Sequence, residues 1–142
     1  MKFAILGAGA VGGYFGARLA EAGENVSFMA RGAHLEAIRS TGLRIESENG
    51  DAHIHPAQVS DDPAEVGPVD YVLFAVKLFQ TEETADFAKP LVGPNTTLVA
   101  LQNGVECANV LSAVHGKEKV LNGTSYIAAV IAEPGLIRQT GT

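Results

Sequence analysis

Residues 3–16 read FAILGAGAVGGYFG, and they decide the fold. Four apolar residues predict a short strand, residues 7–12 follow the pattern G-x-G-x-x-G, and Val11, Phe15 and Leu19 recur at helical spacing. In this context the first glycine permits a tight turn, the second lets a pyrophosphate approach the backbone, and the third lets helix and strand pack closely. The helix N-terminus would add free N–H groups and a partial positive charge. The stretch therefore predicts a dinucleotide-binding loop, the alternative being a glycine-rich turn without a ligand.

The rest of the chain alternates between strand and helix patterns. We expect strands near residues 3–6, 26–30, 70–76, 97–101, 120–121 and 126–131, and helices near 11–22, 34–41, 80–88 and 104–114. The run at 70–76 is almost continuously apolar, as in a parallel strand that helices cover on both faces. This order predicts an α/β fold of the doubly wound Rossmann type, with one domain over residues 1–142.

Two segments depart from this alternation. Residues 43–59 alternate around the Asn-Gly pair at 49–50, which predicts a small antiparallel hairpin whose two turn residues have positive φ. The Pro-Gly pair at 134–135 predicts a second turn near the end of the chain. In the first helix, Gly16 and Ala20 extend the row of small residues that the glycine loop begins, so we expect this helix to lie close to the sheet.

The end of the second predicted strand bears on the choice of cofactor. A site for NAD usually has Asp or Glu there, about 20 residues past the loop, to bind the ribose 2′-hydroxyl. This sequence has Arg31 instead, and the next carboxylate is that of Glu36. An arginine can donate two hydrogen bonds to a 2′-phosphate and stack on adenine. Arg31 therefore predicts NADP(H), the alternative being a solvated surface arginine.

Four predicted parallel strands end in Gly7, Arg31, Lys77 and the Gln-Asn-Gly segment at 102–104. The carboxyl ends of parallel strands share one edge of the sheet, where doubly wound folds bind ligands. We therefore place Lys77 and Asn103 at the cofactor crevice. The alternatives are a solvated lysine at a strand end for Lys77, and a turn residue or helix N-cap for Asn103.

Five segments together resemble the ketopantoate reductases (2-dehydropantoate 2-reductases). They are MKFAILGAGAVGG at 1–13, RG at 31–32, VKLFQT at 76–81, LQNGV at 101–105 and PGLI at 134–137. The likeness runs through the whole chain, and the segments around Lys77 and Asn103 are more specific than the glycine loop. The resemblance implies an NADPH-dependent oxidoreductase that reduces 2-dehydropantoate to pantoate in pantothenate and coenzyme A synthesis.

The same resemblance implies roles for single residues. The pyrophosphate loop would comprise Gly7, Ala8, Gly9, Ala10, Val11 and Gly12. Arg31 would bind the 2′-phosphate, Lys77 would lie near the nicotinamide, and Asn103 would contact both cofactor and substrate. Ala129 would make a backbone contact to the cofactor. Members of the family continue into a helical second domain that supplies the catalytic lysine and most substrate contacts, so we expect this chain to be an N-terminal cofactor domain that is inactive alone, with no catalytic residue of its own.

Composition narrows the class of protein further. Ten basic and sixteen acidic residues give a net charge of -6, which disfavours nucleic acid and anionic membranes as partners. A single cysteine, Cys107, fits a reducing compartment, and we expect the cytoplasm. Glycines interrupt the apolar stretch at the N-terminus, so it does not resemble a signal peptide. His53 and His55 would share a strand face but lack a third ligand, so we expect no metal site.

Other functions remain as alternatives. Another two-domain NADP-dependent dehydrogenase could use a similar first domain for a different substrate. A sensor that binds a dinucleotide without turnover would usually keep an acid at the end of the second strand, and so would a methyltransferase that binds S-adenosylmethionine. Arg31 disfavours both of these classes.

Overall fold

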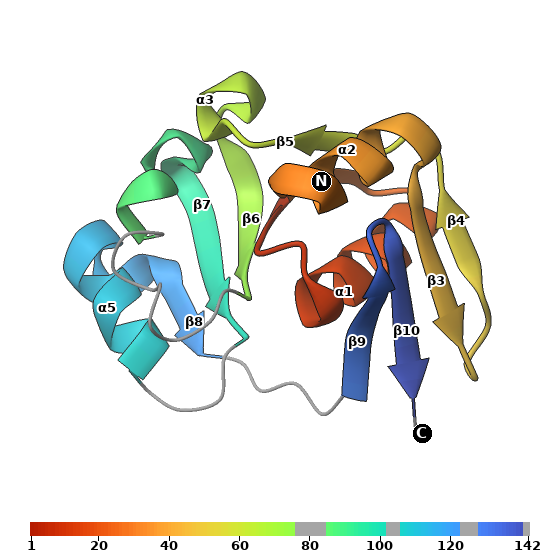
Figure 1. The fold of residues 1–142 in the computed structure, drawn as a ribbon. Helices are drawn as coiled ribbons and strands as arrows, with labels where there is room; N and C mark the ends of the chain where they lie inside the picture. The colour runs from red at the N-terminus through yellow and green to blue at the C-terminus, as the bar shows by residue number, and fades with distance from the viewer. Residues whose placement is uncertain (76–84, 102–105, 123–127, 141–142) are drawn as a thin grey trace.

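The computed structural model describes residues 1–75, 85–101, 106–122 and 128–140, and its main feature is a six-stranded parallel sheet (Figure 1). The strands are β1 (Lys2–Leu6), β2 (Asn25–Met29), β5 (Gln58–Ser60), β6 (Val69–Phe74), β7 (Val92–Ala100) and β8 (Val120–Asn122). They lie in the order β5-β2-β1-β6-β7-β8, and all neighbours are parallel. Counted along the chain this is 3-2-1-4-5-6, the order of a dinucleotide-binding sheet. The predicted doubly wound fold is confirmed.

Helices cover both faces of this sheet. They are α1 (Ala10–Glu21), α2 (Gly32–Thr41), α3 (Pro63–Val66) and α5 (Glu106–His115), with 3-10 turns at η2 (Lys89–Leu91) and η3 (Lys117–Lys119). Neighbouring residues of a strand point to opposite faces, so β1 contributes to two cores. Ile5 packs with Ala17 of α1 and Ile38 of α2. Leu6 packs in the other core, which also contains Leu111 of α5.

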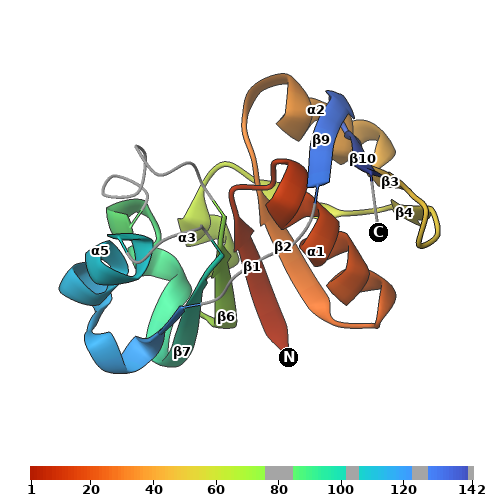
Figure 2. The same cartoon turned by 90° about the horizontal axis from the view of Figure 1, so that it is seen from below.

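A second, four-stranded sheet packs against α1. Figure 2 shows α2 on the same side of the main sheet, next to the four-stranded sheet. Its strands, in spatial order, are β4 (Ala52–Ile54), β3 (Leu43–Ser47), β10 (Leu136–Thr140) and β9 (Ala128–Glu133). The strands β9 and β10 form the hairpin predicted at the Pro-Gly pair, and β10 also pairs in parallel with β3. We did not predict this parallel pairing, because partners such as Arg44 and Leu136 lie far apart in the sequence.

The hairpin predicted over residues 43–59 is right only in part. Strands β3 and β4 are antiparallel, but residues 58–60 leave the hairpin and form β5, which pairs with β2 at the edge of the main sheet. The predicted turn geometry is wrong, because Gly50 has a φ of 111° whereas the φ of Asn49 is not positive. The hydroxyl of Ser47 instead accepts a hydrogen bond from the Asn49 N–H at 3.0 Å. The turn is thus stabilised by a side-chain hydrogen bond, and only one of its two central residues has the positive φ that was predicted for both.

The expected close approach of α1 to the sheet is confirmed. A Cβ atom at Gly12 would meet the carbonyl oxygen of Gly7, and one at Gly16 would lie 2.6 Å from the ring of Phe28. Side chains at these positions would push the helix off the sheet. Ala20, one turn further on, packs against the same core.

Other element boundaries agree with the predictions to within a few residues. The structure describes the helix predicted at 80–88 only from residue 85, and η2 with Pro90 follows it. Strand β7 begins at Val92, earlier than predicted. Among the helices in the described ranges, none has both the length and the apolar character needed to cross a membrane.

Candidate cofactor-binding site

The carboxyl ends of β1, β2 and β6 meet at one edge of the main sheet, as predicted. Backbone hydrogen bonds hold the chain where it leaves that edge: the Ala8 N–H donates to the Met29 carbonyl (3.1 Å), and the Ala75 N–H donates to the Leu6 carbonyl (2.9 Å). Because Leu6 and Met29 are register partners, the glycine loop and the segment that leads to Arg31 leave the sheet at the same level.

The glycine loop has the geometry of an anion-binding turn. Gly7 has a φ of 91°, which favours glycine, and Gly9 is the N-cap of α1. No side chain caps this helix, no acidic residue lies in its first turn, and the Gly13 N–H donates to the Gly9 carbonyl at 2.8 Å. The N–H groups of residues 10–12 precede that bond, so they have no carbonyl of the helix to bind and remain free for phosphate oxygens.

The space at Gly9, where a pyrophosphate would approach the loop, is open in the described structure. Among the described residues, a Cβ atom at Gly9 would have one neighbour within 4 Å, the Cδ1 of Ile131 at 3.9 Å. Gly9 therefore differs from Gly12, where a side chain would collide with the protein itself. The absence of a side chain at Gly9 leaves room for a ligand, whereas its absence at Gly12 lets α1 pack closely on the sheet.

Arg31 lies at the end of β2 as the N-cap residue of α2, and its side chain is exposed. The other four arginines each pair with a carboxylate: Arg18 with Glu21, Arg39 with Glu36, Arg44 with Glu133 and Arg138 with Glu46. Within the described part of the chain, the guanidinium of Arg31 has neither a hydrogen bond nor an ion pair. It is therefore free to bind an anion beside the glycine loop.

The imidazole of His34 ties this loop to the second sheet. Its Nε2 lies 2.7 Å from the carbonyl oxygen of Ala8, and its Nδ1 accepts a hydrogen bond from the Gly135 N–H at 3.0 Å. The carbonyl can only accept, so Nε2 is the donor of this hydrogen bond. We did not predict this contact, because a histidine in the first turn of a helix has no distinctive spacing.

Strand β9 brings Ala129 to the same side of the molecule. The strand packs against α1, and Ala129 is half-buried on the core that contains Ile5. Ile131, further along β9, is the residue that approaches Gly9. The structure thus places β9 beside the glycine loop.

Two predicted site residues, Lys77 and Asn103, lie outside the described residues. His53 lies on β4 and His55 one residue past its end; their rings stack with centroids 5.7 Å apart, and the Nε2 of His53 lies 2.7 Å from the Thr41 carbonyl oxygen. Within the described ranges, no set of three His, Cys, Asp or Glu side chains gathers as metal ligands would.

A buried tyrosine braces α1 against the β3–β4 turn. The guanidinium of Arg18 lies over the ring of Tyr14, 4.9 Å from its centroid, and donates to the Gly50 carbonyl at 2.6 Å. The hydrogen bond from Arg18, opposed by burial and supported by Ser47 and Asn49, lowers the pKa of the Tyr14 hydroxyl. In turn, hydrogen bonds to Glu21 and Tyr14 raise the pKa of Arg18. The sequence patterns gave no sign of this brace.

The sheet order and the glycine loop define a Rossmann-type domain of the kind that oxidoreductases use. The sequence profile of the family described as ketopantoate reductase PanE/ApbA matches residues 3–142. The chain belongs to this family.

Individual relatives agree with this assignment. The chain is 38% identical to the 2-dehydropantoate 2-reductase of Mesorhizobium japonicum, over 97% of this chain and 48% of the relative. The crystal structure of 2-dehydropantoate 2-reductase from Porphyromonas gingivalis is 42% identical, with a TM-score of 0.90, over 98% of this chain and 51% of that one. A ternary structure of D-mandelate dehydrogenase with NADH and anilino(oxo)acetate has the same TM-score at 25% identity, over 100% of this chain and 46% of that one. The chain thus spans about half the length of the proteins that it resembles.

Proposed function

We propose that this chain is the NADP(H)-binding domain of a 2-dehydropantoate 2-reductase, with residues 7–12 holding the pyrophosphate. The free N–H groups at the start of α1 and the open space at Gly9 fit that ligand. The next carboxylate after Arg31 in the sequence is that of Glu36, which pairs with Arg39 at 3.4 Å. This pairing also fits NADP(H), because it engages the carboxylate that could otherwise bind a ribose 2′-hydroxyl.

The observation that carries the choice of NADP(H) is the unpaired guanidinium of Arg31 at the end of β2. Every other arginine of the chain is engaged by a carboxylate, so Arg31 stands out as the one available to a ligand in the described structure. A 2′-phosphate offers it two oxygens and about two negative charges, whereas the 2′-hydroxyl of NADH offers one oxygen and no charge.

Lys77, Asn103 and Ala129 complete the proposed site. In the sequence, Lys77 comes three residues after β6 and Asn103 three residues after β7, the two strands whose ends follow that of β1 along the sheet. We assign Lys77 to the nicotinamide end, Asn103 to cofactor and substrate, and the backbone of Ala129 to the cofactor.

The proposed reaction of the longer protein reduces the 2-oxo group of 2-dehydropantoate to the hydroxyl of pantoate, a cytoplasmic step of pantothenate and coenzyme A synthesis. NADPH supplies a hydride to the 2-carbon when it is bound, and an acid completes the hydroxyl with a proton. The residues described here bind and orient the cofactor. We assign the acid and most substrate contacts to a helical second domain, because the relatives are about twice as long as this chain.

Calorimetry with NADPH and NADH tests the proposal. Losing the charge-assisted bonds in Arg31→Ala should weaken NADPH roughly ten- to a hundred-fold and leave NADH nearly unchanged. Arg31→Lys should recover part of the loss, since an ammonium cannot fork onto two oxygens. Arg39→Ala is the matched control on the same helix and should change neither affinity. Equal affinities for both cofactors in the unmodified chain would show that Arg31 does not bind a 2′-phosphate.

A second candidate is an NADH-dependent 2-hydroxy acid dehydrogenase. It is favoured by the D-mandelate dehydrogenase structure with NADH, which matches the whole of this chain with a TM-score of 0.90. The same calorimetry separates the two candidates, because an NADH enzyme would bind NADH at least as tightly as NADPH.

A further inference from the structure

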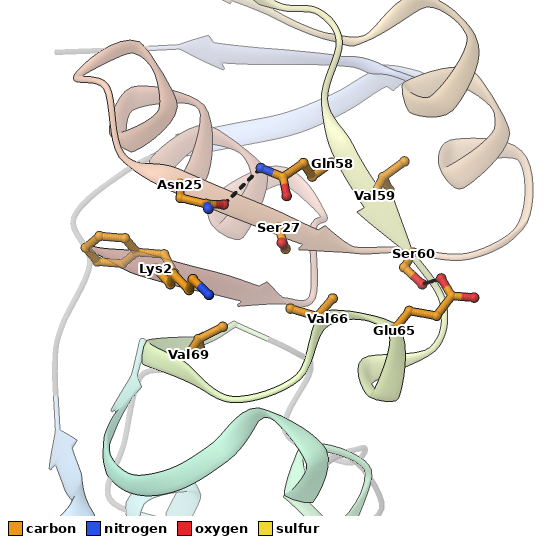
Figure 3. A pocket seen from close by; sticks show the side chains of 10 residues that line it. Lys2, Asn25, Ser27, Gln58, Val59, Ser60, Glu65, Val66 and Val69 are labelled. Carbon is orange, nitrogen blue, oxygen red and sulfur yellow. Dashed lines mark hydrogen bonds between the residues drawn. The ribbon is translucent and has the colours of Figure 1, made fainter.

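A pocket of about 280 Å³ lies on the main sheet and extends from the amino ends of β1 and β2 to the carboxyl end of β5, at Ser60 (Figure 3). Its lining includes Lys2 of β1, Asn25 and Ser27 of β2, Gln58 of β5 and Glu65 of α3. Lys2 lies five residues before the glycine loop on β1, or roughly 16 Å away, whereas Ser60 pairs with Met29 at the level of that loop. The pocket and the loop belong to opposite faces of the sheet: the lining residues Val66 and Val69 pack in one core, and α1, which the glycine loop begins, packs in the other.

The pocket exists because the connection between β5 and β6 is short. Eight residues, 61–68, pass over β2 and β1 to join these strands, and their only helix is the four-residue α3. Parallel strands are usually joined by a dozen or more residues that include a full helix, which covers the sheet. Here the short crossover leaves polar side chains of β1, β2 and β5 facing a cavity.

Ser27 is buried in the pocket with its hydroxyl unsatisfied. The residue is only 8% exposed, and Figure 3 shows it in the middle of the lining, on the same strand as Asn25. Within the described residues, its hydroxyl has no hydrogen-bond partner. A buried hydroxyl without a partner is destabilising and is therefore normally bound by a ligand or water.

Charged groups of opposite sign lie on either side of Ser27. In Figure 3, Lys2 lies at one side of the pocket and Glu65 at the other. The Lys2 ammonium has no partner in the described structure, while one oxygen of Glu65 accepts from the Ser60 hydroxyl at 2.7 Å and leaves the second oxygen free. The neighbouring carboxylate of Asp70 is engaged by the Lys2 backbone N–H at 2.8 Å and does not line the pocket.

Amide groups between these charges are held in fixed orientations. The Gln58 Nε2 donates to the Asn25 Oδ1 at 2.9 Å, which Figure 3 shows as a dashed line. This bond leaves the Nδ2 of Asn25 as a donor and the Oε1 of Gln58 as an acceptor. The pocket thus presents a cation, amide groups and a hydroxyl, and a carboxylate.

We propose that this pocket binds a small zwitterion of the amino acid class. Its carboxylate lies against Lys2 and the Asn25 amide, its ammonium group lies against Glu65, and Ser27 binds a polar atom between them. The pocket's own charges cancel, so a ligand with one positive and one negative group complements it, whereas an anion or a cation alone leaves one charge unpaired.

The first test is an NMR titration of the ¹⁵N-labelled chain. The probes are glycine, 3-aminopropanoate and 4-aminobutanoate, raised to about 50 mM, which exceeds the millimolar affinity expected from a few polar contacts. Butanoate and butylamine carry one charge each, and glycerol carries none. Saturable shifts of the Lys2, Asn25 and Ser27 amides with at least one zwitterion support the proposal. The proposal is overturned if these shifts saturate with none of the zwitterions, or if they saturate equally with butanoate, butylamine or glycerol.

A charge exchange tests the two ends of the pocket. Lys2→Glu and Glu65→Lys should each weaken the best zwitterion by about tenfold or more, the effect of one lost charge-assisted bond. The double variant should regain affinity, because the ligand can bind in the reverse direction. Lys117→Glu, on η3, alters net charge as Lys2→Glu does but should have no effect. Thermal unfolding identifies variants that fail to fold; in folded variants, single exchanges that leave binding unchanged overturn the assignment.

Discussion

The Nε2 of His34 lies 2.7 Å from the carbonyl oxygen of Ala8, inside the glycine loop. The other ring nitrogen accepts from the Gly135 N–H at 3.0 Å, so one side chain joins the first βα turn to the β9–β10 turn. A peptide unit of the loop is thereby held by a side chain of α2. His34 thus positions the loop by holding the Ala8 carbonyl.

Replacing His34 should weaken NADPH binding by loosening the loop. His34→Leu removes one hydrogen bond to Ala8, so we expect roughly a two- to tenfold loss of affinity by fluorescence titration. His34→Gln, which has both a donor and an acceptor, should recover part of it. His53→Leu is the matched control, because His53 also bonds a backbone carbonyl, that of Thr41, away from the loop. Equal losses in both leucine variants would contradict a role for His34 in the loop.

Two glycines of the loop should respond differently to the same substitution. Gly9→Val should abolish NADPH binding and leave the fold intact, because among the described residues only Ile131 comes within 4 Å of a Cβ atom there, at 3.9 Å. Gly12→Val should lower the thermal unfolding midpoint, because its side chain would collide with the Gly7 carbonyl. Circular dichroism and NADPH titration of both variants check this. An unchanged NADPH titration in Gly9→Val would remove the basis for the loop assignment.

The chain on its own should bind NADPH without turning over 2-dehydropantoate. We assign contacts with the cofactor to residues of this chain and the catalytic acid to a further domain. Mixing the chain with NADPH and 2-dehydropantoate and following absorbance at the nicotinamide band measures this directly. Steady oxidation at ordinary enzyme rates, about 1 s⁻¹ or more, would show that the catalytic group lies within residues 1–142.

The Tyr14 hydroxyl should titrate at a lower pH than an ordinary tyrosine. Its hydrogen bond from Arg18 favours the tyrosinate, so its pKa lies below the ordinary 10.0. The tyrosinate therefore adds stability above the unfolded pKa; that contribution is lost as pH falls through the folded pKa and is absent at neutral pH. The difference in tyrosinate absorbance between the unmodified chain and Tyr14→Phe should have a midpoint below 10.0, and Arg18→Met should raise it. A midpoint at or above 10.0 would contradict the assigned hydrogen bond.

Local patterns were sufficient to predict the main sheet and the glycine loop. Strand, turn and helix at residues 3–16 are contiguous, and the conformation of Gly7 and the packing at Gly12 and Gly16 follow from their spacing alone. The position of Arg31 could be predicted because it follows directly from the end of one strand. Its lack of an ion pair in the described structure could not be predicted, since it depends on where the carboxylates lie in three dimensions.

Features that join distant segments were beyond the sequence patterns. The parallel pairing of β3 with β10, the bridge from His34 to Gly135 and the pocket at Ser27 each depend on three-dimensional neighbours. The turn at residues 49–50 was mispredicted for a related reason. Its Asn-Gly pair fits a two-residue hairpin, but the Ser47 hydroxyl stabilises a different backbone.

The close approach of Gly13 to Ile137 has a consequence for the order of folding. A Cβ atom at Gly13 would overlap the Cδ1 of Ile137, so α1 and β10 are in direct contact, and Ile137 is fully buried. Helix α1 is therefore covered on its outer side only after β10, which follows it by more than a hundred residues, has been synthesised. Contacts of such long sequence separation slow folding, because the intervening loop must close first. A nascent chain halted before residue 137 would hold a finished glycine loop on an unfinished core, with Ile45 lacking its neighbour on β10.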